Sequence, residues 1–260
     1  MARNRDLEIL RQAVRQAGQQ VLKLAAEGFE THIKKDRSPV TTADLAVNQI
    51  LHERLLTAFP HDAWLSEESP DGPRRLENKR VWIIDPIDGT KYFMRGVPQY
   101  AISVALVESH QPVVAAVYNP ATDELFSAVR GMGAWLNGQS LHVTPVSDGR
   151  PVVLVNPPAL ERGIFRAIEA AAECRPMGSI AYTLAQVAAG RADATLNLDG
   201  LNEWDVAGGV LLVEEAGGMI MDRNGSPLSF NQPTTTIRGI LAANKDLLDR
   251  LLTFTHTLSR

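Results

Sequence analysis

The sequence has little that would suit a disulfide-bonded, membrane-spanning or nucleic-acid-binding protein. Among 260 residues there is one cysteine, Cys174, which excludes an intrachain disulfide and any zinc cluster of thiolates. The formal net charge is −4, so no excess of basic residues predicts binding to a nucleic acid polymer or to an anionic membrane. No uninterrupted apolar run approaches the roughly 18 residues that a membrane-spanning helix needs.

These absences favour a globular protein of a reducing compartment. Hydrophobic residues make up 45% and charged residues 22% of the chain, which is typical of a folded protein with a substantial core. The charged N-terminal residues run directly into a helical pattern, so we expect no signal peptide and a cytoplasmic location. The histidines are scattered without the spacing of a ligand set, and we expect none of them in a metal site.

The hydrophobic periodicity changes along the first half of the chain. Apolar residues at three- and four-residue steps predict an amphipathic helix over residues 7–24 and a second helix that begins near Thr41 and Thr42. From residue 81 the period approaches two. Short segments rich in Val, Ile, Tyr and Phe then predict an antiparallel meander over residues 100–107, 113–118 and 124–129.

The second half alternates between strand and helix patterns. We expect a strand, two helices, a strand and a final apolar helix, over residues 152–155, 160–173, 180–189, 192–198 and 206–216. The order of helices, meander and alternating elements predicts a layered α+β fold. We expect a single unit over residues 1–260 with two subdomains, 1–145 and 146–260, because a proline-bearing stretch lies between them.

Residues 81–90 combine a strand pattern with two carboxylates. The run Val-Trp-Ile-Ile predicts a buried strand, and Asp85 and Asp88 then lie just past its end. Pro86 fixes the backbone between them, and Gly89 allows a tight turn and a close approach to a ligand. Two hard oxygen donors at this spacing suit Mg²⁺ or Ca²⁺, although the same residue types are also common in solvated turns.

Other acidic residues could complete a metal site. Glu67 and Glu68 follow a short apolar run. Asp205 opens a helix after a strand, where the positive end of the helix also favours an anionic ligand. Asp44 lies near the start of the second helix, where it could equally compensate the helix dipole. Each residue alone has a structural explanation, so the hypothesis of a shared site rests on their combination.

Three motifs, by their sequence and their order along the chain, resemble the inositol monophosphatase superfamily of Mg²⁺-dependent, lithium-sensitive phosphatases. In chain order they are Glu-Glu-Ser at residues 67–69, Asp-Pro-Ile-Asp-Gly-Thr at 85–90, and Trp-Asp-Val-Ala-Gly-Gly at 204–209 followed by Glu-Ala-Gly-Gly at 215–218. The resemblance extends over nearly the whole chain. It implies a layered α-β-α-β-α sandwich of two subdomains, a small phosphorylated metabolite as substrate, and a homodimer.

The same resemblance implies roles for individual residues. The side chains of Glu67, Asp85, Asp88 and Asp205 and the backbone carbonyl of Ile87 would hold two or three Mg²⁺ ions. Such ions neutralise the phosphate oxygens and activate water for an in-line displacement.

Catalysis and substrate binding would use a partly overlapping set of residues. Asp44 and Thr90 would form a hydroxyl–carboxylate pair that orients and deprotonates the attacking water, and Glu67 would belong to the catalytic group. Glu68 would lie behind the metal ligands and would not bind the metal itself. We expect substrate contacts from Asp88, Gly89, Thr90, Lys91, Gly178, Ser179, Asp199, Asn202 and Asp205.

The motifs leave three branches of the superfamily open. Thr90-Lys91, residues 38–44 and residues 202–205 resemble the 3′(2′),5′-bisphosphate nucleotidases. Our first expectation is therefore conversion of adenosine 3′,5′-bisphosphate to AMP. Tyr182, however, stands where that branch has the lysine of Gly-Ser-x-x-Lys.

Residues 130–138 resemble inositol monophosphatase itself, but Leu198 stands where that branch often has an acid, and Asp199 is one step away. Residues 88–98 also resemble the histidinol-phosphate phosphatases. If a helix starts near Thr90, Lys91 and Arg95 lie on one of its faces, where they could contact a second phosphate or simply be solvated. A non-catalytic module that binds metal or phosphate is the alternative from another functional class.

Overall fold

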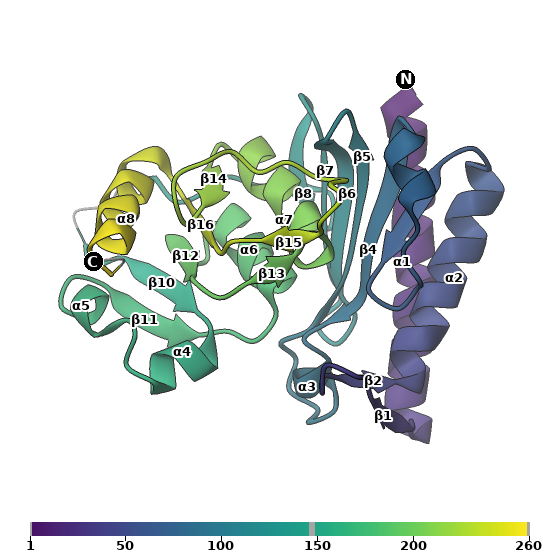
Figure 1. Cartoon of the computed structure of the whole chain (residues 1–260), viewed down its shortest axis with the longest axis horizontal. Coiled ribbons are helices and arrows are strands. Elements are labelled where there is room, and N and C mark those ends of the chain that lie inside the picture. Colours follow the sequence, from purple (N-terminus) through teal and green to yellow (C-terminus); the bar gives the residue numbers. More distant parts are fainter. Residues whose placement is uncertain (1, 146–148, 259–260) are drawn as a thin grey trace.

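The computed structural model describes residues 2–145 and 149–258 and consists of five layers (Figure 1). Helices α1 (Ala2–Glu27) and α2 (Thr42–Ala58) cover the outer face of a seven-stranded sheet. Helices α6 (Ile180–Ala188) and α7 (Glu203–Glu215) lie between this sheet and a five-stranded sheet. The outer face of the second sheet carries α4 (Pro157–Glu161), α5 (Arg166–Glu169) and α8 (Lys245–Leu258). The predicted α-β-α-β-α sandwich is confirmed.

The seven-stranded sheet contains the predicted meander. Its strands are, in spatial order, β3 (Ala63–Ser66), β4 (Arg80–Asp88), β5 (Ala101–Glu108), β6 (Gln111–Asn119), β7 (Glu124–Val129), β8 (Gly133–Leu136) and β9 (Gln139–Ser140). β3 runs parallel to β4, and all other neighbours are antiparallel. The 3₁₀ helix η1 (Pro73–Glu77) connects β3 to β4.

The five-stranded sheet has the spatial order β11 (Glu173–Pro176), β10 (Val152–Val155), β12 (Ala194–Asn197), β16 (Ile240–Ala243) and β14 (Met219–Asp222). The prediction of one helix over residues 160–173 is wrong. Gly163, with φ of 73°, ends α4 and separates it from α5, and Cys174 lies in β11 rather than at a helix end. The expected boundary between subdomains adjoins residues 146–148, which lie outside the described residues, and the division at 145 stays a prediction.

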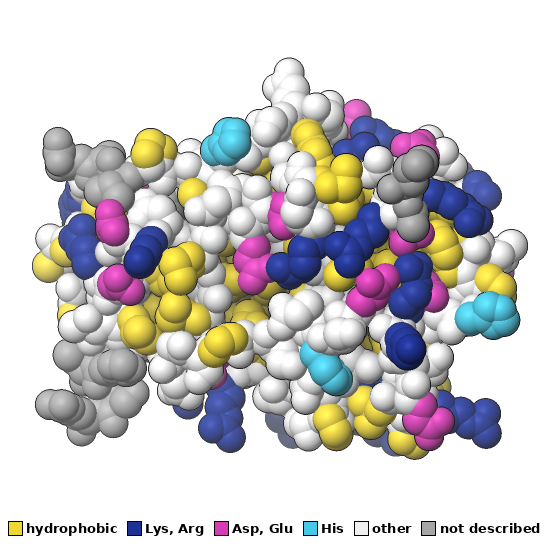
Figure 2. Space-filling view, turned by 90° about the horizontal axis from the view of Figure 1, so that it is seen from above, with side chains coloured by type: hydrophobic (Ala, Val, Ile, Leu, Met, Phe, Trp, Pro, Cys, Tyr) yellow, Lys and Arg dark blue, Asp and Glu magenta, His cyan; other side chains and the backbone are white. Residues whose placement is uncertain are grey.

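Small elements frame the region where the two halves meet. They are the pair β1 (Thr31–Ile33) and β2 (Pro39–Thr41), the pair β13 (Leu201–Asn202) and β15 (Thr236–Ile237), and the one-turn helix α3 (Thr90–Phe93). Within the described residues, no helix is both long and apolar enough to cross a membrane. On the part of the face in Figure 2 that the structure describes, basic and acidic side chains are interspersed rather than gathered by sign.

Strand β4 is buried on both faces, which explains its continuous apolar sequence. Trp82 and Ile84 pack with α1 and α2, whereas Val81 and Ile83 pack with α6 and α7. Side chains alternate between the faces of a strand, so the next residue, Asp85, falls on the α7 side. The fold thus directs this carboxylate into the interface between the two halves of the chain.

Helix α7 approaches its neighbours closely at its two central glycines. A Cβ atom on Gly208 would lie 2.8 Å from Ser103 Oγ of β5, and one on Gly209 would lie 2.5 Å from the Leu184 Cβ of α6. At the C-terminal end of α7, Glu215 accepts hydrogen bonds from the amides of Gly131 and Gly133, both at 2.8 Å. The segment at residues 130–138 therefore has a structural role in anchoring α7.

Candidate active site

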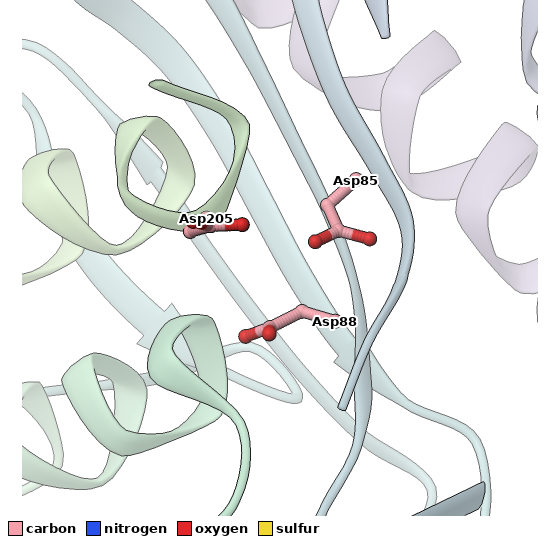
Figure 3. A group of neighbouring side chains, drawn as sticks. All are labelled: Asp85, Asp88 and Asp205. Carbon is pink, nitrogen blue, oxygen red and sulfur yellow. The ribbon is translucent and has the colours of Figure 1, made fainter. Parts of the chain in front are cut away.

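Three aspartates from the two halves of the chain meet beside α7 (Figure 3). Asp85, Asp88 and Asp205 each offer a carboxylate oxygen that lies within 4.8 Å of the others. Asp85 and Asp88 project from β4, and Asp205 projects from the first turn of α7 toward them. The structure thus brings together residues whose proximity the sequence motifs predicted.

A β-bulge explains how two residues of one strand reach the same side. The prediction that the strand ends before Asp85 is wrong, because Asp85 pairs with Ser103 and Asp88 with Ala101 of β5, with a register shift between the two pairs. Regular alternation would place Ile87 on the Asp85 side, yet Ile87 packs with the α1 and α2 cluster. The shift returns Asp88 to the side of Asp85, as a bulge does when it adds one residue to a strand.

The cluster is electrostatically unfavourable without a cation. Asp85 is 2% exposed, and its Oδ1 has no hydrogen-bond partner within the described residues. Burial, together with the charges of Glu67, Asp88 and Asp205, raises the pKa of Asp85 well above its usual range. An orphaned buried carboxylate oxygen in an all-oxygen donor set fits a hard divalent cation, so the residues present are suited to Mg²⁺.

Asp88 and Asp205 are each oriented by hydrogen bonds, Asp88 by a hydroxyl group and an amide and Asp205 by an amide. Asp88 Oδ2 accepts hydrogen bonds from Ser179 Oγ and from the Ala181 amide at the N-terminus of α6, both at 2.6 Å. Burial raises the pKa of Asp88 to about 6, although these hydrogen bonds oppose the shift. Asp205 Oδ2 accepts from the Asn202 amide at 2.7 Å, and burial followed by the charge of Asp88 raises its pKa well above the usual range.

Glu67 lines the same cavity as the aspartates but is paired with a lysine. The ammonium group of Lys34, in the loop between β1 and β2, contacts Glu67 and lies 2.9 Å from Glu68 Oε1. Burial lowers the pKa of Lys34, but hydrogen bonds to the two glutamates outweigh burial and raise it above the usual value. Lys34 was missed by the sequence analysis, because residues 34–39 showed only the pattern of a polar loop.

The predicted hydroxyl–carboxylate pair is present. Thr90 Oγ1 lies 3.2 Å from Asp44 Oδ1 and 3.0 Å from the carbonyl oxygen of Ile87, so its proton can bond to either. Asp44 also forms the capping box of α2, where its Oδ2 accepts from the amide and hydroxyl of Thr41 at 2.7 and 2.6 Å. Burial raises the pKa of Asp44 against these hydrogen bonds. Asp44 therefore caps α2 and also lies next to Thr90.

Two glycines shape the cavity next to the aspartates. Gly89 has φ of 89°, and a Cβ there would lie 2.8 Å from the carbonyl oxygen of Gln99. A Cβ on Gly178 would lie 2.2 Å from the ring of Tyr92. The cavity has a volume of about 220 Å³ and is lined by Ser38, Pro39, Glu67, Asp85, Ile87, Asp88, Gly89, Thr90, Lys91, Tyr92, Gly178 and Asp205.

Three of the predicted substrate contacts do not line this cavity. Ser179 caps α6 and donates to Asp88, and Asn202 is the N-cap residue of α7. Asp199 is paired instead with Arg162 at 3.6 Å and accepts from Asn156 at 3.4 Å. Ser38, Pro39 and Tyr92 line the cavity but were not predicted as substrate contacts, because the resemblance of residues 38–44 and 88–98 to other branches assigned no contact to these three.

Tyr182 stands where the nucleotidase branch has a lysine, and its side chain is used for packing. The phenol donates to the Glu124 carboxylate, which also pairs with Arg191. Burial followed by the hydrogen bond to Glu124 raises the pKa of Tyr182 to about 12. Tyr182 does not line the cavity, so the lysine of the motif has no functional substitute at this position.

A layered α+β fold with a carboxylate cluster that could hold a metal ion and an adjacent hydroxyl–carboxylate pair is consistent with a phosphatase that uses metal ions. Comparison with known proteins then gives the family. The family model of the inositol monophosphatases matches residues 3–259, and the chain belongs to this family. The protein is therefore a phosphatase of the inositol monophosphatase family.

Known relatives are similar over almost the whole chain. An inositol-1-monophosphatase from Rhizobium meliloti (strain 1021) is 38% identical over 96% of this chain and 98% of its own length. The crystal structure of the extragenic suppressor protein suhB from Bartonella henselae superposes with a TM-score of 0.85 and 30% identity, covering 95% of this chain and 97% of that one. The structure of SaIMPase-II with bound inositol monophosphate gives a TM-score of 0.80 and 25% identity over 95% and 91% of the two chains.

Proposed function

We propose that this phosphatase is an inositol-1-monophosphatase that requires Mg²⁺. The observation that carries the proposal is the grouping of Asp85, Asp88 and Asp205 beside the Thr90–Asp44 pair in one small cavity. The 38% identity to an inositol-1-monophosphatase and the fold shared with an inositol monophosphate complex support this substrate. Inositol 1-phosphate therefore replaces adenosine 3′,5′-bisphosphate, our first expectation from the sequence, as the preferred candidate.

The packing of Tyr182 also weighs against the bisphosphate. A substrate with two phosphates needs a cationic contact for the phosphate that does not react. Tyr182 instead directs its hydroxyl group to Glu124, away from such a role. Lys91 lines the cavity and is the basic residue that could take a second phosphate, so the bisphosphate stays a substrate to be tested.

A nucleoside 2′-phosphate is the second candidate. SaIMPase-II also has a structure with bound 2′AMP, with a TM-score of 0.81 and 26% identity to this chain. The cavity lies beside the candidate metal ligands, and Tyr92 is one of its lining residues. The ring of Tyr92 offers an apolar surface against which a base or a cyclitol could pack. The assay below separates these substrates.

The proposal extends to the roles of single residues. Glu67, Asp85, Asp88, Asp205 and the carbonyl of Ile87 would hold two or three Mg²⁺ ions. Bound Mg²⁺ would supply positive charge against the phosphate oxygens and polarise the attacking water. Without metal, the negative charge of the carboxylates would repel a phosphate dianion, so phosphate and metal should bind together.

The protein groups would bind phosphate and move a proton. The backbone amides at Gly89 and Thr90, at the start of α3, would donate to the phosphate. Water would attack phosphorus and give its proton to Thr90 Oγ1, which would pass its own proton to Asp44 Oδ1, 3.2 Å away. The P–O bond to the inositol oxygen would break, and solvent would protonate the leaving oxygen. The raised pKa of Asp44 suits it to accept this proton.

Phosphate release from four substrates tests the proposal. Inositol 1-phosphate, 2′-AMP, adenosine 3′,5′-bisphosphate and histidinol phosphate are each assayed with Mg²⁺ or with chelator. We expect the highest kcat/KM for inositol 1-phosphate and no turnover in chelator. Asp88→Asn should abolish turnover, whereas Asp246→Asn, at an exposed position of α8, should not change it. A higher kcat/KM for another substrate would refute the assignment, and turnover of none would favour the binding module.

A further inference from the structure

A buried glutamate on α7 holds a distant loop rather than a ligand. Glu203 is 1% exposed and lies in the first turn of α7, two residues before Asp205. Its Oε2 accepts from the Asn231 amide at 2.6 Å, and its Oε1 accepts from the Gln232 amide at 2.8 Å. Both carboxylate oxygens are therefore occupied by the backbone of one loop, outside the cavity of the aspartates.

A buried arginine holds the same loop from the other side. Arg75 belongs to η1, which follows the turn at Glu67 and Glu68, and is 4% exposed. It donates to Asn231 Oδ1 at 2.7 Å and to the carbonyl oxygen of Gln232 at 2.9 Å. Asn231 Nδ2 donates back to the carbonyl oxygen of Arg75 at 3.2 Å. The loop at residues 231–232 is thus fixed between η1 and α7.

Asp71 completes the arrangement on the side of η1. Its two carboxylate oxygens accept from Arg75 Nε at 2.7 Å and from Nη2 at 3.0 Å, which is the bidentate geometry that fixes a guanidinium group. Arg75 therefore has little freedom to follow a movement of the loop. Asp71 itself is exposed, and we call the four residues Arg75, Asn231, Gln232 and Glu203 the buried clamp.

The buried clamp connects the two segments that carry opposing metal-ligand candidates. One segment runs from Glu67 through η1 into β4, and the other is the N-terminus of α7 with Asp205. Asp205 faces Asp85 and Asp88 within 4.8 Å, and these buried carboxylates repel one another. Repulsion would move the end of α7 away from β4 unless other contacts hold it. Buried charges are an expensive means of stabilisation, so a role in fixing geometry explains them better.

We propose that Glu203 and Arg75 are positioning residues that hold Asp205 at the distance from Glu67, Asp85 and Asp88 required for Mg²⁺ binding. The inference rests on the proposed metal site. Groups that orient metal ligands without touching the metal typically contribute about ten- to a hundredfold to metal affinity. Loss of the buried clamp should therefore weaken Mg²⁺ binding even where the chain stays folded.

Calorimetric titration with Mg²⁺ alone tests this inference without a substrate. Glu203→Gln replaces one acceptor oxygen by a donor that faces a backbone amide, and Arg75→Met removes the fork of donors. Both variants should raise the Kd for Mg²⁺ by about tenfold or more. Arg75→Lys retains the charge but not the fork and should have an intermediate Kd.

The opposite end of α7 provides a matched control. Glu214 contacts Arg130 at 2.8 Å, so Glu214→Gln also weakens a contact by which a glutamate tethers this helix, but at the end far from Asp205. The Kd of Glu214→Gln for Mg²⁺ should stay within twofold of the wild-type value.

The outcomes separate the two proposals. If wild type binds Mg²⁺ and the clamp variants are folded, by circular dichroism, with an unchanged Kd, the clamp is only structural and the inference is wrong. If Arg75→Met does not fold, Arg75→Lys decides by the same criterion. If wild type itself binds no Mg²⁺, the proposed function fails and the inference fails with it.

Discussion

Replacing one buried aspartate by asparagine should stabilise the protein when no metal is present. Asp85→Asn removes a charge that lies within 4.8 Å of two other carboxylates, and it removes no hydrogen bond formed by Asp85 Oδ1 within the described residues. Most substitutions of buried residues destabilise a protein. An increase in stability is therefore a distinctive result for the proposed site.

The geometry gives the approximate size of this effect. At 4.8 Å and an effective dielectric constant of about 20, two full charges repel by ~3.5 kcal/mol. Partial protonation lowers this value, because burial and the neighbouring carboxylates raise the pKa of Asp85 well above its usual range. We expect a net gain of about 2 kcal/mol, which for a protein of this size raises Tm by about 4–8 °C.

Thermal unfolding followed by circular dichroism, in chelator and in millimolar Mg²⁺, measures the effect. Wild type should gain stability from Mg²⁺, by ~2.7 kcal/mol when the metal concentration is a hundred times Kd. Asp85→Asn should have the higher Tm in chelator and lose most of the response to Mg²⁺.

Asp62→Asn is the matched control, because Asp62 is also a buried carboxylate but accepts from Arg80 Nε at 2.8 Å and from Trp82 Nε1 at 2.9 Å. Asp62→Asn should lower the free energy of unfolding by about 1–3 kcal/mol and should still be stabilised by Mg²⁺. A lower Tm for Asp85→Asn in chelator would refute the reasoning.

Four further changes test other parts of the structure. In chelator, the free energy of unfolding of wild type, measured with urea, should fall as pH rises from about 4 through 6. The reason is that the pKa of Asp88 is raised to about 6 in the folded state, so the stability present below the unfolded-state pKa is lost as pH rises through 6. In excess Mg²⁺ this decrease should disappear, and equal slopes with and without metal would contradict the site. Ser179→Ala removes a donor to Asp88 and should raise the calorimetric Kd for Mg²⁺ by about tenfold, so an unchanged Kd would exclude this role. Thr90→Val should lower kcat by about a hundredfold or more, whereas Thr90→Ser should retain most of the rate; full activity of the valine variant would rule out the proton transfer. Gly208→Ala should cost about 1–3 kcal/mol in urea unfolding, because its Cβ would approach Ser103 Oγ to 2.8 Å, and a neutral effect would show that α7 can shift.

Hydrophobic periodicity predicted most of the elements but not their irregularities. Strands β5 to β7 and helices α1, α2, α6 and α7 follow from patterns of two or of three and four residues. The helix expected over 160–173 failed because Gly163 takes a left-handed conformation that a periodic pattern does not reveal. The sequence predicted that β4 ends before Asp85, because a charged residue usually marks the end of a buried strand. Asp85 lies inside the strand because it faces Asp205 of α7, a neighbour that the local sequence does not reveal.

The sequence predicted which aspartates lie together in the candidate site but not the contacts around them. The order of the motifs grouped Asp85, Asp88 and Asp205, and the structure brings these three together. The pairing of Lys34 with Glu67 depends on how the β1–β2 loop folds over the cavity, which no local pattern encodes. Asp199 shows the converse, since its sequence position suggested a substrate contact and the fold pairs it with Arg162.

The division of the aspartate cluster between β4 and α7 has a consequence for synthesis of the protein. Asp85 and Asp88 leave the ribosome early, whereas Asp205 and the loop that fixes its helix belong to the last quarter of the chain. A nascent chain that has completed only the meander therefore holds two of the three clustered aspartates and lacks the third. Capture of Mg²⁺ with full affinity should thus be a late event of folding, and a bound ion would report that both ends of the chain have reached their final places.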